Sequence, residues 1–285
     1  MSFSYLLSFF KNTRVLTFFA LTSFLVFSLV DRGHADFYGE HEIGLQPFAS
    51  DRYGASYYVP ADFTPEQDWP LVIVLYSDEA GKGAQFVKAW LSEIGKRHVI
   101  VLFVSYLAPR NVPFSSDERI LRLKKELMEK YPINPNRIWL TAYGAAAHYA
   151  FYLGACYPEH FSAVALAAGG AQGRFEPFFV YHRKNIEKIA FLILYGSNDP
   201  SIQKNVFVNK HHALVKRGFQ IEMEEYDQVG HQFLPEFRTK IMDWFQNFPL
   251  ATRERIEEVE AEKISSISFG IPKFVFSVVR GIMKS

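Results

Sequence analysis

The segment Arg137–His148 (RIWLTAYGAAAH) constrains the fold more than any other part of the chain. It begins with a short apolar run typical of a buried strand, turns sharply near Gly144, and continues with small residues that favour a helix. A buried strand that leads directly into a helix is the repeating unit of an alternating α/β fold. The segment therefore predicts a layered domain in which this turn lies at the carboxyl end of a sheet strand.

The rest of the chain repeats this alternation. Leu71–Tyr76 is a continuous apolar run, as expected for a strand that is buried on both faces of a sheet. Gln220–Tyr226 alternates instead, which suits a strand at the edge. Strands that alternate with helices predict an α/β fold with a doubly wound, mainly parallel sheet and helices on both faces. The other predicted strands are Ala55–Val59, His98–Ser105, Phe161–Ala168 and Ile189–Tyr195. The predicted helices are one that Gly81 and Gly83 open and that runs through Gly95, Asp117–Tyr131, the elbow helix to about Tyr157, Ile202–Arg217 and Leu234–Phe248.

The turn has the spacing of a nucleophile elbow, in which a strained strand-to-helix turn raises one reactive side chain above the sheet. The expected pattern is small-x-nucleophile-x-small, and the chain has Ala142, Gly144 and Ala146 at the three defined positions. Gly144 thus occupies the nucleophile position without a side chain. The backbone supports this interpretation, because the elbow residue is strained and glycine relaxes that strain.

The N-terminus has the pattern of a targeting segment. Lys11 and Arg14 precede Val15–Val30, an uncharged apolar run, and Gly33–Ala35 is a small-x-small site. This order predicts a secretory signal that is cleaved after Ala35, with an uncleaved membrane anchor as the close alternative and a buried core helix as a weaker one. In the first two cases the main domain is exported, since the basic residues stay inside.

The C-terminal residues differ in composition from the domain before them. Thr252–Lys263 is highly charged and is predicted to form a solvated helix. Ile271–Lys284, placed on a helix, has one apolar face and one face with basic and polar residues. Such a helix can lie in a membrane interface, and the alternative is a tail helix packed on the domain or on a partner. We therefore predict three parts: 1–35, 36–250 and 251–285.

Composition excludes several classes of function. The net charge of +1 gives no global electrostatic case for binding nucleic acid. The single cysteine, Cys156, rules out an intramolecular disulfide, and its apolar surroundings suggest a buried thiol. We find no Cys/His cluster with metal-ligand spacing, because the adjacent His211 and His212 point in different directions on a helix. No metal or other cofactor is predicted.

Four short motifs in a fixed order suggest a family. They lie in Ile133–Thr141 (INPNRIWLT), Tyr157–Phe161 (YPEHF), Gly196–Pro200 (GSNDP) and Gly230–Phe233 (GHQF). With these motifs, residues of about 50–248 resemble the α/β-hydrolase fold, specifically secreted esterases that include polyhydroxybutyrate depolymerase-like and feruloyl-esterase-like proteins. The order of elbow, Asp and His is the order that this fold requires. Motifs of this kind are more specific for the fold than for an activity.

The resemblance assigns two further site residues. Asp199 matches the acid of the catalytic triad, and His231 matches the base. In an acting triad the acid holds the imidazole in one tautomer, and the imidazole removes a proton from the nucleophile. The structural alternatives are a turn-initiating Asp before Pro200 and a surface or capping histidine.

The sequence departs from the family pattern in both catalytic elements. Gly144 excludes an acyl-enzyme at that position. Tyr76 and Ser77 stand where the family has His-Gly in its oxyanion loop, so the oxyanion positions here are Ser77 and the backbone of Ala145. The carboxylates of Asp78 and Glu79 follow, and they would oppose a developing oxyanion. These losses indicate a decayed ester-cleaving site.

Three hypotheses of function remain. The first is an exported pseudo-hydrolase that retains the Asp199–His231 pair and binds a small ester or carboxylate, since backbone N–H groups near Ala145 favour an anion. The second is an active esterase in which the pair activates water, Ser77 or Ser197. The third is a membrane-associated interaction protein.

A cysteine and an aromatic run are two further candidates for the site. Cys156 lies about twelve residues beyond Gly144 on a helix, which places it roughly 18 Å away and removes it as a nucleophile. Phe175–Tyr181 is a candidate pocket lining, although such aromatic clusters more often serve packing. The substrate or ligand does not follow from the sequence.

Overall fold

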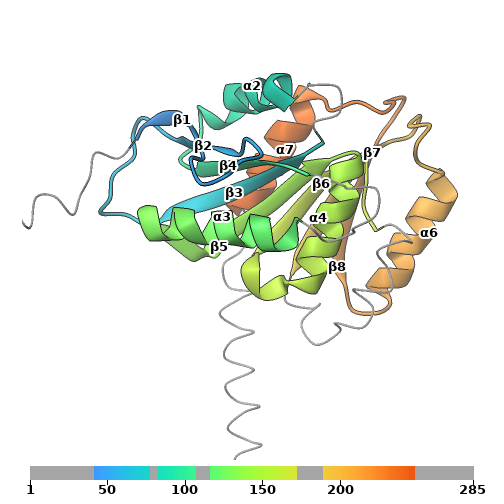
Figure 1. Cartoon of the computed structure of the whole chain (residues 1–285). Coiled ribbons are helices and arrows are strands. Elements are labelled where there is room, and N and C mark those ends of the chain that lie inside the picture. Colours follow the sequence, from blue (N-terminus) through green and yellow to red (C-terminus); the bar gives the residue numbers. More distant parts are fainter. Residues whose placement is uncertain (1–41, 78–82, 107–115, 172–188, 248–285) are drawn as a thin grey trace, which may run out of the picture. The chain divides into compact units, whose positions relative to one another are not determined.

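A computed structural model of the chain describes residues 42–77, 83–106, 116–171 and 189–247. All described elements belong to the unit that begins at Ile43. Its centre is an eight-stranded sheet with the order β1-β2-β4-β3-β5-β6-β7-β8 (Figure 1). The strands are β1 Gly44–Pro47, β2 Ser56–Val59, β3 Trp69–Tyr76, β4 Ile100–Ser105, β5 Ile133–Tyr143, β6 Ala163–Ala167, β7 Ala190–Gly196 and β8 Gln220–Tyr226.

In sheet order, the strands from β4 to β8 are parallel to one another, whereas the β1–β2 and β2–β4 pairs are antiparallel. Every residue of β3, β4, β6 and β7 is buried, which explains their continuous apolar sequences. β8 has only partly buried and exposed residues and lies at the sheet edge, as its alternating sequence predicts. The predicted mainly parallel sheet is therefore confirmed.

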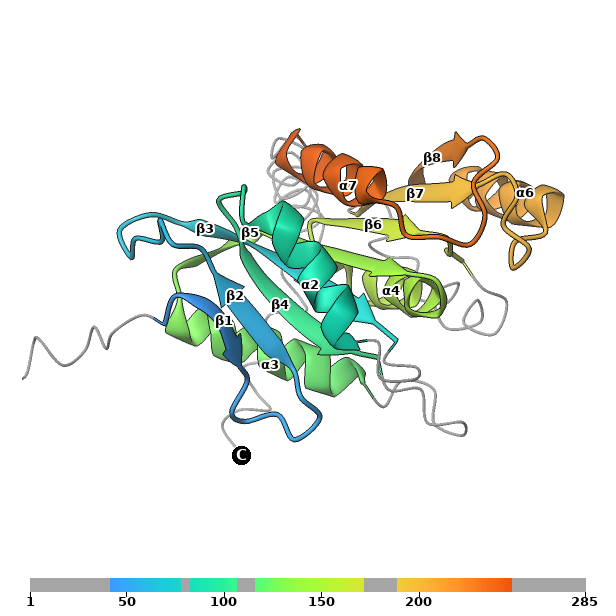
Figure 2. The ribbon, with the colours of Figure 1, turned by 90° about the horizontal axis from the view of Figure 1, so that it is seen from above.

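Helices cover both faces of the sheet, as predicted (Figure 2). α2 and α7 pack on one face, where Trp90 and Phe245 are fully buried. α3, α4 and α6 pack on the other face, where Leu123 and Phe151 are fully buried. The helices are α2 Gly83–Ile94, α3 Asp117–Lys130, α4 Ala145–Cys156, α6 Lys204–Val215 and α7 Pro235–Asn247, with the short 3-10 helix η3 at Pro158–His160.

Two strands differ from the sequence prediction. β1 was not expected, because its sequence GLQP resembles a turn, yet it pairs with β2 along its whole length. β5 begins at Ile133, four residues before the expected start at Arg137, and the β3–β5 register shifts between Trp69 and Leu71. This irregularity accommodates Pro135, which has no N–H to donate to a regular ladder.

The predicted segments 1–35 and 251–285 lie outside the described residues, as do Asp78, Glu79 and Phe175–Tyr181. The predicted domain boundaries and the two proposed membrane-related segments thus remain predictions. Among the residues that the structure describes, no helix is both long and apolar enough to cross a bilayer.

Candidate active site

The turn between β5 and α4 has the backbone of an elbow. β5 ends at Tyr143 and α4 begins at Ala145, so Gly144 alone connects them. Gly144 has φ +59° and ψ −126°, a conformation that residues with a side chain rarely adopt. Its N–H donates to the carbonyl of Ala167 on β6 at 2.9 Å, and its carbonyl accepts from the N–H of Ala147 at 3.0 Å. The strained turn is therefore kept, and it is occupied by glycine.

A second glycine lets the chain after β6 pass close to the turn. A Cβ atom on Gly169 would lie 2.7 Å from the carbonyl oxygen of Gly144 and 2.7 Å from the Cβ of Ala147. Real side chains do not approach this closely, so any larger residue at 169 would displace the elbow.

The loops that carry Asp199 and His231 follow neighbouring strands. Asp199 comes after β7 and His231 comes after β8, and these strands are paired along their whole length. The N–H of Asn198 donates to the carbonyl of Val229 at 3.0 Å, which joins the two loops. A Cβ atom on Gly196 would lie only 2.1 Å from the same carbonyl oxygen, so this close passage requires glycine.

The side chains of Asp199 and His231 are in direct contact. Nδ1 of His231 lies 2.8 Å from Oδ2 of Asp199. The Asp199 side chain is fully buried, whereas 38% of the His231 side chain is exposed. A buried carboxylate that holds one nitrogen of a partly open imidazole leaves the other nitrogen available to a ligand.

Ser201 is a third member of this network. Its hydroxyl donates to Oδ1 of Asp199 at 2.6 Å, and its backbone N–H donates to the same oxygen at 2.8 Å. The hydroxyl oxygen also lies 3.0 Å from Nδ1 of His231. Burial alone would raise the pKa of Asp199, but the hydrogen bonds from Ser201 and His231 outweigh it and hold this pKa below its usual value. The carboxylate is therefore ionised at neutral pH.

The second nitrogen of His231 faces the elbow. A Cβ atom on Gly144 would lie 3.2 Å from Nε2 and 3.6 Å from Cε1 of His231. A hydroxyl carried by such a Cβ would be within hydrogen-bond reach of this nitrogen. The structure thus brings the three predicted site residues Gly144, Asp199 and His231 together.

Aromatic rings form one wall beside the histidine. The ring of Tyr143 lies 5.0 Å from the ring of His231 and 5.2 Å from that of Phe233. Burial and the nearby charge of Asp199 raise the pKa of Tyr143 to about 12. The phenol therefore stays neutral at physiological pH.

The predicted oxyanion residues lie at the same edge of the sheet. Ser77 is half-buried and directly follows β3, which pairs with β5. Ala145 is exposed and is the first residue of α4, where backbone N–H groups have no partner within the helix. No described contact places the Ser77 hydroxyl on His231.

The other candidate nucleophiles are accounted for. The hydroxyl of Ser197 accepts from the N–H of Gln228 at 2.8 Å and donates to Asp227 at 3.2 Å, so it stabilises the loop that carries His231. Cys156 is the last residue of α4, at the end remote from Gly144, and is half-buried rather than buried. Burial raises the pKa of its thiol to about 12, which makes it unreactive.

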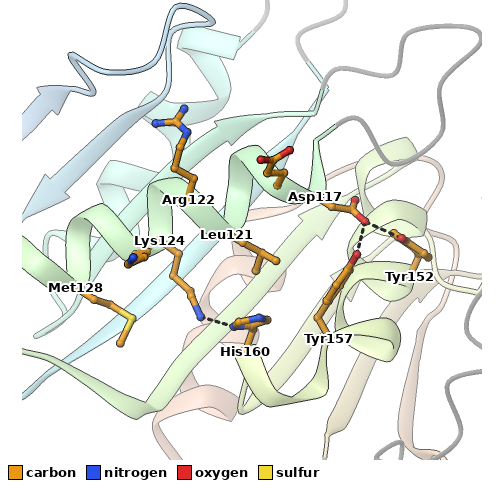
Figure 3. A pocket seen from close by; sticks show the side chains of 10 residues that line it. Asp117, Leu121, Arg122, Lys124, Met128, Tyr152, Tyr157 and His160 are labelled. Carbon is orange, nitrogen blue, oxygen red and sulfur yellow. Dashed lines mark hydrogen bonds between the residues drawn. The ribbon is translucent and has the colours of Figure 1, made fainter. Parts of the chain in front are cut away.

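Within the described ranges, no group of three His, Cys, Asp or Glu side chains could hold a metal ion. A separate groove of about 820 Å³ lies between α3 and the region around η3 (Figure 3). Its lining includes Asp117, Leu121, Tyr157 and His160, and none of its lining residues belongs to the Asp199–His231 network.

Comparison with known proteins supports the fold. No protein-family model and no curated protein matches the sequence. Among solved structures, Thermogutta terrifontis esterase 2 phosphorylated by paraoxon is similar with a TM-score of 0.55 and 14% identity, over 71% of this chain and 93% of that chain. A ferulic acid esterase is similar with a TM-score of 0.52 and 14% identity, over 74% and 98%.

A thermostable esterase is similar with a TM-score of 0.54 and 17% identity, over 70% of this chain, which spans 61% of the length of that esterase. At such identities a likeness establishes the fold and not the activity. The chain therefore has an α/β-hydrolase-like fold that is shared with esterases.

Sequence reasoning missed two functional contributors. Ser201 lies two residues after Asp199. The sequence indicates its role only in that a serine in a turn can donate a hydrogen bond to a carboxylate two residues before it. Gly169 gives no signal by itself, because its requirement for glycine comes from the elbow backbone that packs against it.

Proposed function

We propose that this protein is an exported pseudo-hydrolase that binds a small ester or carboxylate at the Asp199–His231 pair. The observation that carries the proposal is the position of Nε2 of His231, 3.2 Å from where a Cβ on Gly144 would lie. The base of a triad therefore faces the nucleophile position, which holds no side chain.

The same geometry argues against a covalent intermediate on this chain. Ser201, a serine in contact with His231, lies on the Nδ1 side, where its hydroxyl is bonded to Asp199. A nucleophile must instead deliver its proton to Nε2. The imidazole and the first N–H groups of α4 can still hold an oxygen-bearing ligand, because both offer hydrogen bonds to a carboxylate or carbonyl.

A second candidate is a carboxylic-ester hydrolase in which the Asp199–His231 pair activates water or Ser77. The intact pair favours this candidate, because the bond between Nδ1 and Asp199 leaves Nε2 free to act as a general base. The absence of a positioned nucleophile at residue 144 makes it the less favoured one.

Export and membrane contact are further parts of the proposal. The apolar run Val15–Val30 behind Lys11 and Arg14 supports export or N-terminal anchoring. The amphipathic sequence Ile271–Lys284 supports contact with a membrane surface, and a membrane-associated interaction protein is the third candidate. The net charge of +1 gives no support to nucleic acid as a partner.

The test is an esterase assay of the full chain with p-nitrophenyl butyrate. We expect the wild type to be inert and Gly144→Ser to gain activity that His231→Ala removes. The new serine would be strained by roughly 1–3 kcal/mol at this backbone conformation, but His231 is partly exposed and can shift to accommodate it. Hydrolysis by the wild type that His231→Ala abolishes would instead support the second candidate.

Ligand binding is tested separately by NMR titration with methyl butyrate and with butyrate. We expect His231→Ala to weaken binding about tenfold, which corresponds to the loss of a hydrogen bond of about 1.4 kcal/mol. His212→Ala is the matched control, since His212 is an exposed histidine on α6. Equal binding by wild type and His231→Ala would contradict the proposed site.

A further inference from the structure

The side of His231 that faces the elbow is open to a ligand. Leaving out the glycine and its two chain neighbours, the atoms described within 4 Å of a Cβ on Gly144 are Nε2 and Cε1 of His231. Apart from its chain neighbours Tyr143 and Ala145, therefore, no other described side chain lies within 4 Å of this position. An oxygen that a ligand brings beside Gly144 can approach Nε2 to hydrogen-bond distance.

The hydrogen bonds at the other nitrogen define the chemistry of Nε2. The carboxylate of Asp199 and the hydroxyl oxygen of Ser201 lie 2.8 Å and 3.0 Å from Nδ1, and the Ser201 proton is directed to Oδ1 of Asp199. Nδ1 therefore carries the proton and donates it to both oxygens. The neutral ring then has its lone pair on Nε2, which is the form of a general base.

We propose that the missing nucleophile is replaced by a hydroxyl group of the ligand itself, and that the site moves an acyl group between neighbouring hydroxyls of a partly acylated polyol. This inference rests on the proposed function, because it uses the same His231 site, and it names the class of ligand and the reaction. The substrates are monoesters of vicinal diols.

The reaction is balanced without any other reactant. Nε2 of His231 takes the proton of the free hydroxyl while that oxygen forms a bond to the carbonyl carbon of the adjacent ester. A five-membered cyclic intermediate results, with negative charge on the former carbonyl oxygen. The bond from this carbon to the original ester oxygen then breaks, and that oxygen takes the proton back from Nε2. The product is the isomeric monoester.

Glycine at residue 144 directs the chemistry to this outcome. The chain offers no oxygen there, so the acyl group must pass directly from one oxygen to another. A neighbouring hydroxyl is held next to its own carbonyl, and effective molarities of such intramolecular reactions reach about 10⁵ M or more. This advantage favours the tethered hydroxyl over water. The backbone N–H of Ala145 lies at the start of α4, where a developing oxyanion is stabilised.

The test follows glycerol 2-monobutyrate by NMR with the full chain at pH 7. We expect the wild type to convert it to the 1-monobutyrate about a hundredfold faster than His231→Ala does, without release of butyric acid. His212→Ala should match the wild type. Ethyl butyrate has the same acyl group without a neighbouring hydroxyl, and we expect it to remain intact.

The other outcomes separate the two proposals. If the wild type binds glycerol 2-monobutyrate more tightly than His231→Ala does but isomerises it no faster, the ligand site stands and the acyl-transfer inference is wrong. If His231→Ala affects neither binding nor isomerisation, both are wrong. Release of butyric acid from both esters by the wild type would show that water attacks, which overturns both in favour of an active hydrolase.

Discussion

Two buried aspartates in this molecule are both well supplied with hydrogen-bond donors but have different partners. Asp117 begins α3 and accepts hydrogen bonds from the hydroxyls of Tyr149, Tyr152 and Tyr157. Figure 3 shows the bonds from Tyr152 and Tyr157, at 2.6 and 3.0 Å. Asp199 accepts its bonds from Ser201 and from His231. Each carboxylate is buried and well supplied with donors, so burial and hydrogen bonding alone do not distinguish a structural acid from a functional one.

The difference lies in what the donors can do. Burial, reinforced by the charge of Asp117, raises the pKa of Tyr149 and of Tyr152 far above neutrality, so these phenols keep their protons. The Asp117 network joins α3 to α4 and moves no proton. The Asp199 network ends in an imidazole, the side chain that can exchange a proton near neutral pH, and its far nitrogen is open.

His211 and His231 differ in a similar way, in what their ring nitrogens contact. His211 is fully buried, accepts the N–H of Ala171 at 3.0 Å through Nε2 and contacts the carbonyl of Phe207 at 2.8 Å through Nδ1. Both of its nitrogens are used by the backbone. In His231, by contrast, the bonds to described residues are made at Nδ1 alone, with the side chains of Asp199 and Ser201. His231 thus differs from His211 in having Nε2 without a bond to the described residues, on the side that faces Gly144.

The largest expected effect concerns Asp199. In a Gly144→Ser background, Asp199→Asn should lower the His231-dependent esterase rate about a thousandfold, because an amide no longer holds the imidazole in the productive tautomer. The measurement is kcat/KM for p-nitrophenyl butyrate. Asp117→Asn in the same background is the matched control and should leave the rate of the folded protein unchanged. An equal loss of kcat/KM in both variants would contradict the proposed difference between Asp199 and Asp117.

The next effect concerns stability. Asp117→Asn should lower the free energy of unfolding by about 3 kcal/mol, because two buried tyrosine hydroxyls and a half-buried one lose their carboxylate acceptor. Urea denaturation measures this loss. Tyr157→Phe removes a single donor and should cost about 1 kcal/mol. A small effect of Asp117→Asn would mean that the tyrosines find other partners.

A third prediction concerns acid. Burial, with smaller effects from Lys210, His148 and His212, lowers the pKa of His211 to about 4. Because the unfolded state then binds a proton that the folded state does not, the stability contributed by neutral His211 is complete above about pH 6.5 and is lost as the pH falls toward 4.

We expect a loss of about 2 kcal/mol between pH 6.5 and 4.5, measured by urea denaturation at each pH. His211→Gln should flatten this dependence, whereas the exposed-residue control His212→Gln should keep it. If the slope is the same in all three proteins, His211 is not its source.

The smallest effect concerns Ser201. Ser201→Ala should weaken the binding of methyl butyrate a few-fold, since it removes one hydrogen bond worth about 1 kcal/mol from the carboxylate that positions His231. Ser201→Thr keeps the hydroxyl and should restore the affinity. If Thr fails to rescue the loss while the protein remains folded, Ser201 acts through packing and not through its hydroxyl.

Much of this arrangement follows from sequence, and the remainder depends on contacts between distant segments. The buried strands are recognisable because apolar runs such as Leu71–Tyr76 are unbroken. Gly144 marks the elbow because its conformation favours glycine. Asp199 and His231 required the family resemblance, since an isolated Asp before Pro200 more often starts a turn.

The unpredicted features have no local signal. The pairing of β1 depends on β2 beside it, because the sequence GLQP has little strand propensity of its own. The role of Ser201 depends on a histidine thirty residues further along the chain. Such features are fixed by tertiary contact, which a single sequence does not record.

The close passage of Gly196 beneath the carbonyl of Val229 has a mechanical consequence. With no room for even one carbon atom between them, the loops of the acid and the base cannot slide past each other. The two loops are also joined by the hydrogen bond from the N–H of Asn198 to the carbonyl of Val229, so we expect them to move together. The contact between Asp199 and His231 is thus built into the packing of the two loops and does not depend on a bound ligand.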